Sequence, residues 1–215
     1  MTLLPLTPDE LLSTTRSVRK RLDLTRDVPR ELIDECLTLA LQAPSGSNRQ
    51  TWHWLVITDP ALRQRVGHYY RLAVDDYLTS EGAAGSLFAD DPERSAVQRR
   101  VHESVAYLGE HMGEAPVLVI PCLRVRGPLE AENQAGLWGS ILPAAWSYML
   151  AARARGLGTA WTTLHLEYER ELSAELGIPD DVYQAALIPT AYYTGQTFAP
   201  AARQPLEQVV HRERW

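Results

Sequence analysis

The chain has 215 residues, of which 45% are hydrophobic and 22% are charged, and its formal net charge is −6. This length and composition predict one globular domain with a single core, and the negative charge disfavours binding to nucleic acid or to an anionic membrane surface. No run of about 18 apolar residues could span a bilayer, and the N-terminal residues lack the order of a secretory signal, so we expect a cytoplasmic protein. Cys36 and Cys122 lie in apolar segments without CxxC spacing, which predicts reduced core residues.

Two helices and a strand are predicted in the first third of the chain. Residues 7–10 have the types and spacing of a capping box followed by proline, which marks the start of a helix. Apolar residues recur at helical spacing over 29–43 until Pro44 ends the pattern. The aromatic and β-branched run over 52–59 predicts a buried strand, and another helix begins directly after it.

The region 71–95 is the least regular part of the sequence. Gly82, Gly85 and Pro92 interrupt any period, so we expect an excursion from the core here. Residues 68–95, which include Tyr69, Tyr70, Arg71 and Phe88, are our prediction for a lid or specificity element.

Helices and strands continue to alternate in the rest of the chain. The turn GLGTAW at 156–161 follows a helix and enters a strand, which is the reverse of a dinucleotide-binding turn and excludes that signature. The predicted elements are, in order, a helix over 92–113, a strand over 115–123, a helix over 135–155, a strand over 159–165, a helix over 169–176, a strand over 185–195 and a polar tail to residue 215.

Four segments carry side chains suited to binding a small polar cofactor. Residues 16–21 place four cations and a serine hydroxyl together, and guanidinium groups bind phosphate oxygens in pairs of hydrogen bonds. The loop 43–50 offers Asn and Gln amides, which present a donor and an acceptor together to a flat heterocycle. The strand end at 158–163 and Arg203 in the tail complete the set. Each segment also has a plainer explanation: a solvated basic turn, an ordinary loop, a core tryptophan and an exposed arginine.

Signatures of other chemistries are missing. The six histidines show no HExxH motif and no close pairing typical of zinc ligands, so we predict no metal site. There is no GxSxG elbow and no GxxxxGK[ST] loop, which removes the usual markers of α/β-hydrolases and P-loop enzymes.

Five motifs, taken in order, resemble those of the nitroreductase family. They are RSVR at 16–19, APSGSNRQTW at 43–52, GLGTAWT at 156–162, LGIPDDV at 176–182 and the final PAARQPLEQVVHRERW at 200–215. The resemblance runs nearly end to end. It implies an α+β fold, a nitroreductase-like α/β/α sandwich with a mostly antiparallel central sheet. It also implies an intertwined homodimer with FMN at the subunit interface and a C-terminal arm that reaches across the partner.

The resemblance assigns the cofactor contacts residue by residue. Arg16 and Ser17 match the phosphate and ribityl contacts, and Arg203 matches a basic residue that completes the phosphate clamp. Arg19 matches a cation beside the pyrimidine side of the flavin, where it would stabilise the negative charge of the reduced ring. The remaining matches are a loop that touches the flavin from the partner subunit, made of Pro44, Ser45, Gly46, Asn48 and Gln50, and a segment near the dimethylbenzene ring and N5, made of Trp161, Thr162 and Thr163.

Three positions depart from the family pattern. Many relatives have a second arginine where Thr15 stands, a proline where Thr51 stands, and a segment containing glycine where Thr162 and Thr163 stand. The first change would weaken the phosphate clamp, and the others would reshape the pocket.

The implied function is an FMN-dependent oxidoreductase that transfers hydride from NADPH or NADH through bound flavin to a small acceptor such as a nitroaromatic, a quinone or an enone. Ping-pong kinetics would follow. No catalytic side chain is required, because flavin N5 carries the chemistry. The alternatives are a flavin enzyme of another reaction, such as reductive dehalogenation, dehydrogenation or flavin breakdown, a non-enzymatic flavin-binding or sensing protein, and a relative that has lost flavin. Nothing in the sequence selects the acceptor or the nicotinamide nucleotide.

Overall fold

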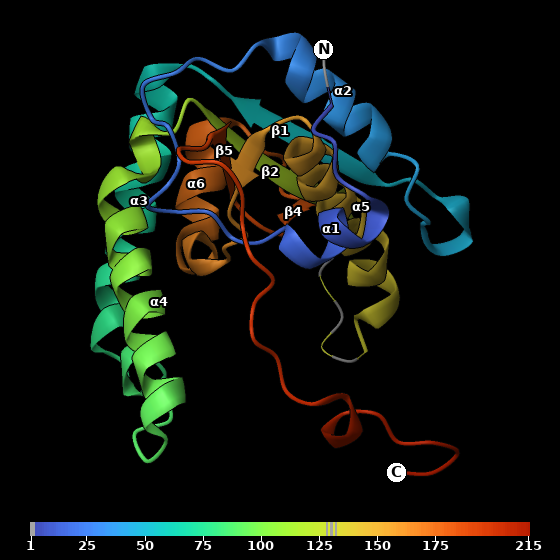
Figure 1. Cartoon of the computed structure of the whole chain (residues 1–215). Helices are drawn as coiled ribbons and strands as arrows, with labels where there is room; N and C mark the ends of the chain where they lie inside the picture. The colour runs from blue at the N-terminus through green and yellow to red at the C-terminus, as the bar shows by residue number, and fades with distance from the viewer. Residues whose placement is uncertain (1–2, 128, 130, 132) are drawn as a thin grey trace.

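The chain folds into an α/β/α sandwich in a computed structural model that describes residues 3–127, 129, 131 and 133–215 (Figure 1). A five-stranded sheet lies between two layers of helices. All of the strand pairs in this sheet are antiparallel. The predicted fold class is therefore confirmed.

The central strand of the sheet is β2 (Val117–Arg124), which is buried along its whole length except for its last residue. It pairs with β1 (Trp52–Ile57) on one side and with β5 (Ile188–Tyr192) and β4 (Val182–Gln184) on the other. The short strand β3 (Leu157–Thr159) lies beyond β5. Because β1 is at the edge, most of its residues are only partly buried, so the prediction of a fully buried strand at 52–59 is wrong.

Each face of the sheet has its own apolar cluster and its own helices. Val117 and Val119 of β2 pack with α2 (Arg30–Ala40) and α5 (Ala135–Ala154) on one face. Leu118 and Ile120, which point the other way, pack with α3 (Pro60–Thr79), α4 (Pro92–His111) and α6 (Glu169–Leu176). The short helix α1 (Pro8–Thr14) contacts α5. Five 3₁₀ turns in the described chain are η1 (Gly46–Asn48), η2 (Ala84–Ser86), η3 (Met112–Glu114), η4 (Leu164–Tyr168) and η5 (Leu206–Gln208).

Local sequence signals explain several boundaries. Thr7 and Glu10 form the predicted capping box, in which each side chain bonds the other's backbone N–H. Gly177 ends α6 in the left-handed conformation, with φ of 66°. Cys36 and Cys122 are confirmed as free, buried thiols, and burial raises their pKa values to about 11 and about 12.

The prediction that 71–95 is one irregular excursion is wrong, because α3 continues to Thr79, whereas α4 begins at Pro92 as predicted. The buried residues Tyr70, Ala73 and Val74 on one face of α3 keep that helix regular against the core. Together α3 and α4 form a helical hairpin that projects beyond the sheet (Figure 1).

The predicted strand over 159–165 is also too long. Strand β3 ends at Thr159, Thr162 forms only an isolated bridge with Leu187, and residues 164–168 turn into η4. The strand expected over 185–195 is shorter than predicted, and the separate strand β4 was not expected. The tail leaves the body as an extended arm (Figure 1). Within the described residues, no helix combines the length and the apolar character needed to cross a membrane.

Candidate functional site

The RSVR segment at 16–19 is joined directly to the end of β3. Ser17 forms a parallel bridge with Thr159, and the Val18 N–H donates to the Thr159 carbonyl at 2.7 Å. The Trp161 N–H lies 3.4 Å from the Ser17 hydroxyl oxygen, which accepts its hydrogen bond. The structure therefore brings two segments together that are more than a hundred residues apart in sequence.

A glycine allows this close approach. A Cβ atom at Gly158 would lie 3.2 Å from side-chain atoms of both Val18 and Leu22. That distance is shorter than an ordinary van der Waals contact, so a larger residue would push residues 17–22 away from β3.

Two arginines of this junction carry charges that have no acidic partner among the described residues. The exposed Arg16 donates from Nη1 to the Ala199 carbonyl at 2.9 Å, and the partly buried Arg19 donates to the Ser104 hydroxyl at 3.4 Å. Burial lowers the pKa of Arg19, and the neighbouring Tyr70 and Tyr77 partly offset this effect. No ion pair involves Arg16 or Arg19 among the residues that the structure describes. Both guanidinium groups thus keep donors for an anionic ligand.

The residues after β3 differ in exposure. Trp161 is half-buried, Thr162 is buried and Thr163 is exposed. The backbone of Thr162 is fixed by hydrogen bonds in both directions with Leu187, at 3.2 and 2.8 Å. The Thr162 hydroxyl donates to the Tyr70 hydroxyl at 3.2 Å.

The loop with Pro44, Ser45, Gly46, Asn48 and Gln50 lies elsewhere in the chain. Its Gly46 N–H donates to the Ser140 hydroxyl at 3.0 Å, near the beginning of α5, on the side of the body opposite the α3–α4 hairpin (Figure 1). Except for the half-buried Ser45, these five residues are exposed. One chain therefore does not bring this loop together with residues 16–19.

The backbone of this loop is unusual. Ser47, Asn48 and Gln50 have φ of 53°, 52° and 51°, in the left-handed region that residues other than glycine rarely adopt. The Gln50 amide donates to the Asn48 side-chain oxygen at 2.9 Å, so the two predicted amides are paired with each other. Strained backbone of this kind is concentrated at functional sites.

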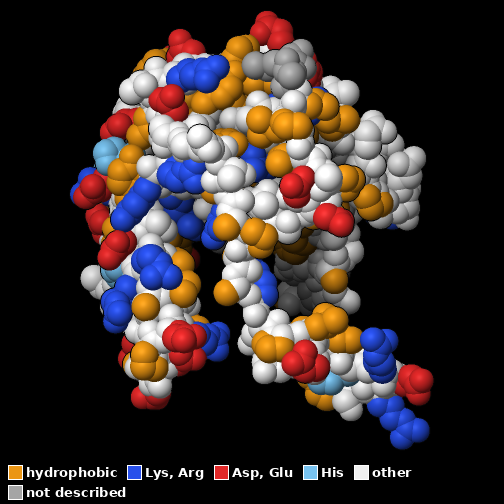
Figure 2. Space-filling model, viewed as in Figure 1, with side chains coloured by type: hydrophobic (Ala, Val, Ile, Leu, Met, Phe, Trp, Pro, Cys, Tyr) orange, Lys and Arg blue, Asp and Glu red, His pale blue; other side chains and the backbone are white. Residues whose placement is uncertain are grey.

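Arg203 lies in the exposed arm, where its guanidinium contacts only its neighbour's carbonyl, Ala202, at 3.0 Å among the described residues. The base of the arm is nevertheless next to the junction, because Arg16 bonds Ala199. Large apolar side chains on the arm are exposed, with Leu206 at 67% and Trp215 at 100%. Figure 2 shows Lys and Arg side chains, with acidic ones between them, over the hairpin on the side facing this arm.

Thr15, where the sequence departs from the family pattern, directs its hydroxyl into the end of α1. Its hydroxyl donates to the Leu11 carbonyl at 2.6 Å, inside the last turn of α1. It therefore offers no hydrogen-bond donor in place of the missing arginine.

Sequence reasoning missed several partners of the predicted residues. Tyr70 was assigned to a specificity element, but it is 1% exposed and bonds Thr162. Ser104 and Ser140, the partners of Arg19 and Gly46, were not selected. The helical period would have placed Tyr70 on the buried face of its helix with Val66, yet only the fold shows which hydroxyl it meets.

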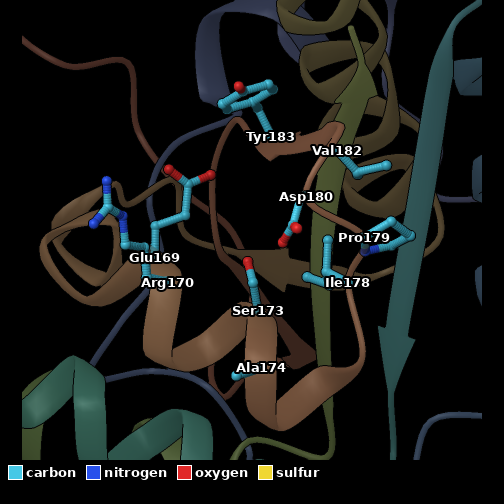
Figure 3. Close-up of a pocket in the computed structure, with 9 residues that line it drawn as sticks. All are labelled: Glu169, Arg170, Ser173, Ala174, Ile178, Pro179, Asp180, Val182 and Tyr183. Atoms are coloured by element: carbon cyan, nitrogen blue, oxygen red, sulfur yellow. The ribbon is translucent and has the colours of Figure 1, made fainter. Parts of the chain in front are cut away.

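A cavity of about 570 Å³ lies away from all of these residues, beside α6 (Figure 3). The carboxylate of Glu169, at its edge, accepts a hydrogen bond from the Gln184 N–H at 2.8 Å. The cavity is open and contains none of the predicted site residues, so we do not take it as the cofactor site. Its lining residues are Glu169, Arg170, Ser173, Ala174, Ile178, Pro179, Asp180, Val182 and Tyr183. Among the described residues, no group of three or more His, Cys, Asp or Glu side chains could hold a metal ion.

Comparison with known proteins gives consistent matches. The model of one protein family, the nitroreductase family, matches residues 12–192. A protein of Methanothermobacter thermautotrophicus, provisionally named an NADH dehydrogenase/NAD(P)H nitroreductase, is 28% identical over 210 residues, covering 96% of this chain and 86% of that protein. Iodotyrosine deiodinase 1 of Rattus norvegicus is 26% identical over 205 residues, covering 94% of this chain and 67% of the deiodinase.

A solved structure shares the fold. The FMN and NADPH-dependent nitroreductase from Sphigopyxis sp. strain HMH superposes with a TM-score of 0.69 at 23% identity, covering 98% of this chain and 100% of that one. At this identity the likeness shows the common fold alone.

Proposed function

Because this chain belongs to the nitroreductase family, we propose that it is an FMN-dependent oxidoreductase. It would pass hydride from NADPH or NADH through bound flavin to a small acceptor such as a nitroaromatic, a quinone or an enone. The names of the relatives from Methanothermobacter thermautotrophicus and Sphigopyxis support the flavin and the nicotinamide nucleotide.

The observation that carries this proposal is the junction between residues 16–19 and the end of β3. There, Arg16, Ser17 and Arg19 follow one another closely in a segment bridged to β3, and neither arginine has an acidic partner in the described chain. A cation that is partly buried without a counter-charge, as Arg19 is, is costly unless a ligand supplies that charge. A flavin mononucleotide, with its phosphate and its electron-accepting ring, fits this set of donors.

Each residue of the junction has a distinct role in the proposal. Arg16 and Ser17 hold the phosphate and ribityl chain, and Arg203 completes the phosphate clamp. Arg19 holds a positive charge beside the ring and favours the reduced, more negative flavin. When bound, FMN supplies the hydride-transfer chemistry at N5. The protein therefore has to bind and orient the flavin and to exclude water from the site.

We further propose that the active form is a homodimer. In one chain, the loop 44–50 and the junction at 16–19 lie on different sides of the body (Figure 1). If both contact the same flavin, as the family resemblance implies, the loop must come from a second copy. The exposed apolar residues of the arm support the same assembly, because burying them requires a partner surface.

Residues 68–95, at the end of the α3–α4 hairpin, remain our proposal for the lid or specificity element. The tip of the hairpin at 80–91 lies outside the two helices, and it includes the exposed Phe88, whose φ is 59° and whose ring is covered by the Arg94 guanidinium at 3.3 Å. In this proposal the irregular tip and the helical turns beside it close together over a bound acceptor.

Reductive dehalogenation is the second candidate reaction. The similarity to iodotyrosine deiodinase 1 over 94% of this chain is the observation that favours it. Incubating the reduced flavoprotein with a halogenated and a nitrated phenol, and analysing the products, would separate the two reactions.

The first test is anaerobic absorbance spectroscopy of the FMN-reconstituted protein. We expect NADPH or NADH to bleach the flavin band at about 450 nm and the acceptor to restore it, with ping-pong steady-state kinetics. Bound flavin that neither nucleotide reduces would favour the sensing protein or another electron donor. Protein that retains no flavin would refute the proposal.

A further inference from the structure

The hydroxyl of Thr162 is committed to a single partner in the described part of the chain. It donates to the Tyr70 hydroxyl at 3.2 Å, and both residues are buried, at 8% and 1% exposure. The backbone bonds between Thr162 and Leu187 fix the position from which this hydroxyl projects. The pair is therefore preorganised by the fold.

The direction of this hydrogen bond determines what Thr162 can offer to another neighbour. A threonine hydroxyl has one proton and two lone pairs. With its proton directed to Tyr70, the Thr162 oxygen can still accept a hydrogen bond but can no longer donate one.

Tyr70 is also electrostatically linked to Arg19. Burial raises the pKa of the Tyr70 phenol, and the hydrogen bond from Thr162 and the positive charge of Arg19 only partly offset this effect, so the phenol stays neutral. Tyr70 thus contacts or influences two of the predicted flavin residues from one helix.

We propose that Tyr70 is a positioning residue that holds Thr162 as a hydrogen-bond acceptor and so biases the bound flavin toward its reduced form. This inference rests on the proposed function and on the family resemblance, which implies that Thr162 lies near N5 of the flavin. In oxidised flavin N5 is an acceptor, whereas in reduced flavin it carries a hydrogen. A neighbour that can only accept a hydrogen bond therefore stabilises reduced flavin, whose N5 carries a hydrogen. It does not stabilise oxidised flavin, whose N5 needs a donor.

The test is a redox titration of the FMN-loaded protein and its variants. Tyr70→Phe frees the Thr162 proton to donate to the oxidised ring. One neutral hydrogen bond corresponds to a change of up to about tenfold in the reduced-to-oxidised ratio, which is about 30 mV for a two-electron couple. We expect the midpoint potential of Tyr70→Phe to become more negative by up to that amount.

Two further variants separate this role from a loss of packing. Tyr148→Phe is a matched control, because Tyr148 is also fully buried and shares a 2.9 Å hydroxyl pair with Thr190, on the α2–α5 face of the sheet. Thr162→Val removes the hydroxyl on which Tyr70 acts. We expect Tyr148→Phe to keep the wild-type potential, and Tyr70→Phe to have no further effect when added to Thr162→Val.

The outcomes distinguish this inference from the proposed function. Bound FMN with an unchanged potential in Tyr70→Phe, or an equal shift in Tyr148→Phe, would overturn the positioning role and leave the flavoprotein intact. A shift that persists in the Thr162→Val background would show that Tyr70 acts by another route and would also overturn it. Wild-type protein that binds no FMN would refute both the positioning role and the proposed function.

Discussion

Replacing Arg16 with alanine tests the phosphate role of the RSVR segment most directly. In the structure this side chain makes one hydrogen bond, to the Ala199 carbonyl at 2.9 Å, and it is exposed. A guanidinium group has five N–H donors, so most of its capacity is open to a phosphate. Removing an exposed side chain of this kind should change the free energy of unfolding by less than about 1 kcal/mol.

The expected effect on cofactor binding is much larger. A hydrogen bond to a charged group contributes about 1.5–3 kcal/mol, and each 1.4 kcal/mol corresponds to about a tenfold change in Kd. Arg16→Ala should therefore weaken FMN binding by about 10- to 100-fold. The turnover of the FMN-saturated enzyme should change by less than about twofold, since a remote phosphate contact binds the ground state and the transition state equally.

Fluorescence titration of FMN into the apoprotein gives the Kd. The matched control is Arg30→Ala, which removes the same charge from a side chain that is 87% exposed and pairs only with Asp34 among the described residues. If Arg16→Ala binds FMN within about twofold of Arg30→Ala, then Arg16 does not contact the phosphate and the reasoning is refuted.

Three other predictions concern the junction, the core and the arm. Gly158→Ala should lower the free energy of unfolding by about 1–3 kcal/mol in urea titrations, because its Cβ would crowd Val18 and Leu22 at 3.2 Å; an unchanged midpoint would contradict the close approach. Burial lowers the pKa of His165 from 6.5 to about 3, so between those values the unfolded chain binds more protons and stability should fall with falling pH by up to about 1.4 kcal/mol per pH unit. His165→Asn should flatten that slope in unfolding experiments, and an equal slope in both proteins would assign it to other groups. Deleting residues 200–215 should weaken FMN retention and shift the protein to a smaller species in size-exclusion chromatography, whereas an unchanged elution volume would argue against an arm that joins two subunits.

The secondary structure was predictable wherever a local signal was strong. The capping box at Thr7, the apolar period of residues 30–40 and the uniformly apolar run of β2 each correspond to an observed element. Errors arose where the long-range context decided the outcome. Residues 71–79 were grouped with the breakers at Gly82 and Gly85, yet they stay helical because one face of α3 packs on the core. Residues 160–165 have β-propensity but no strand neighbour beyond the Thr162–Leu187 bridge, so they do not extend β3.

The sequence by itself determined which residue types are available to a flavin site, the order of the motifs that carry them and the family to which the chain belongs. Those features depend on local chemistry and on the linear arrangement of residues. The tertiary structure alone decided that Ser17 meets Thr159, that Tyr70 receives the Thr162 proton, that Arg19 has no acidic partner in the described chain, and that the loop 44–50 stays away from residues 16–19 in one chain. These contacts join residues far apart in sequence, and their geometry follows from how the sheet and the helices pack, which no local pattern encodes.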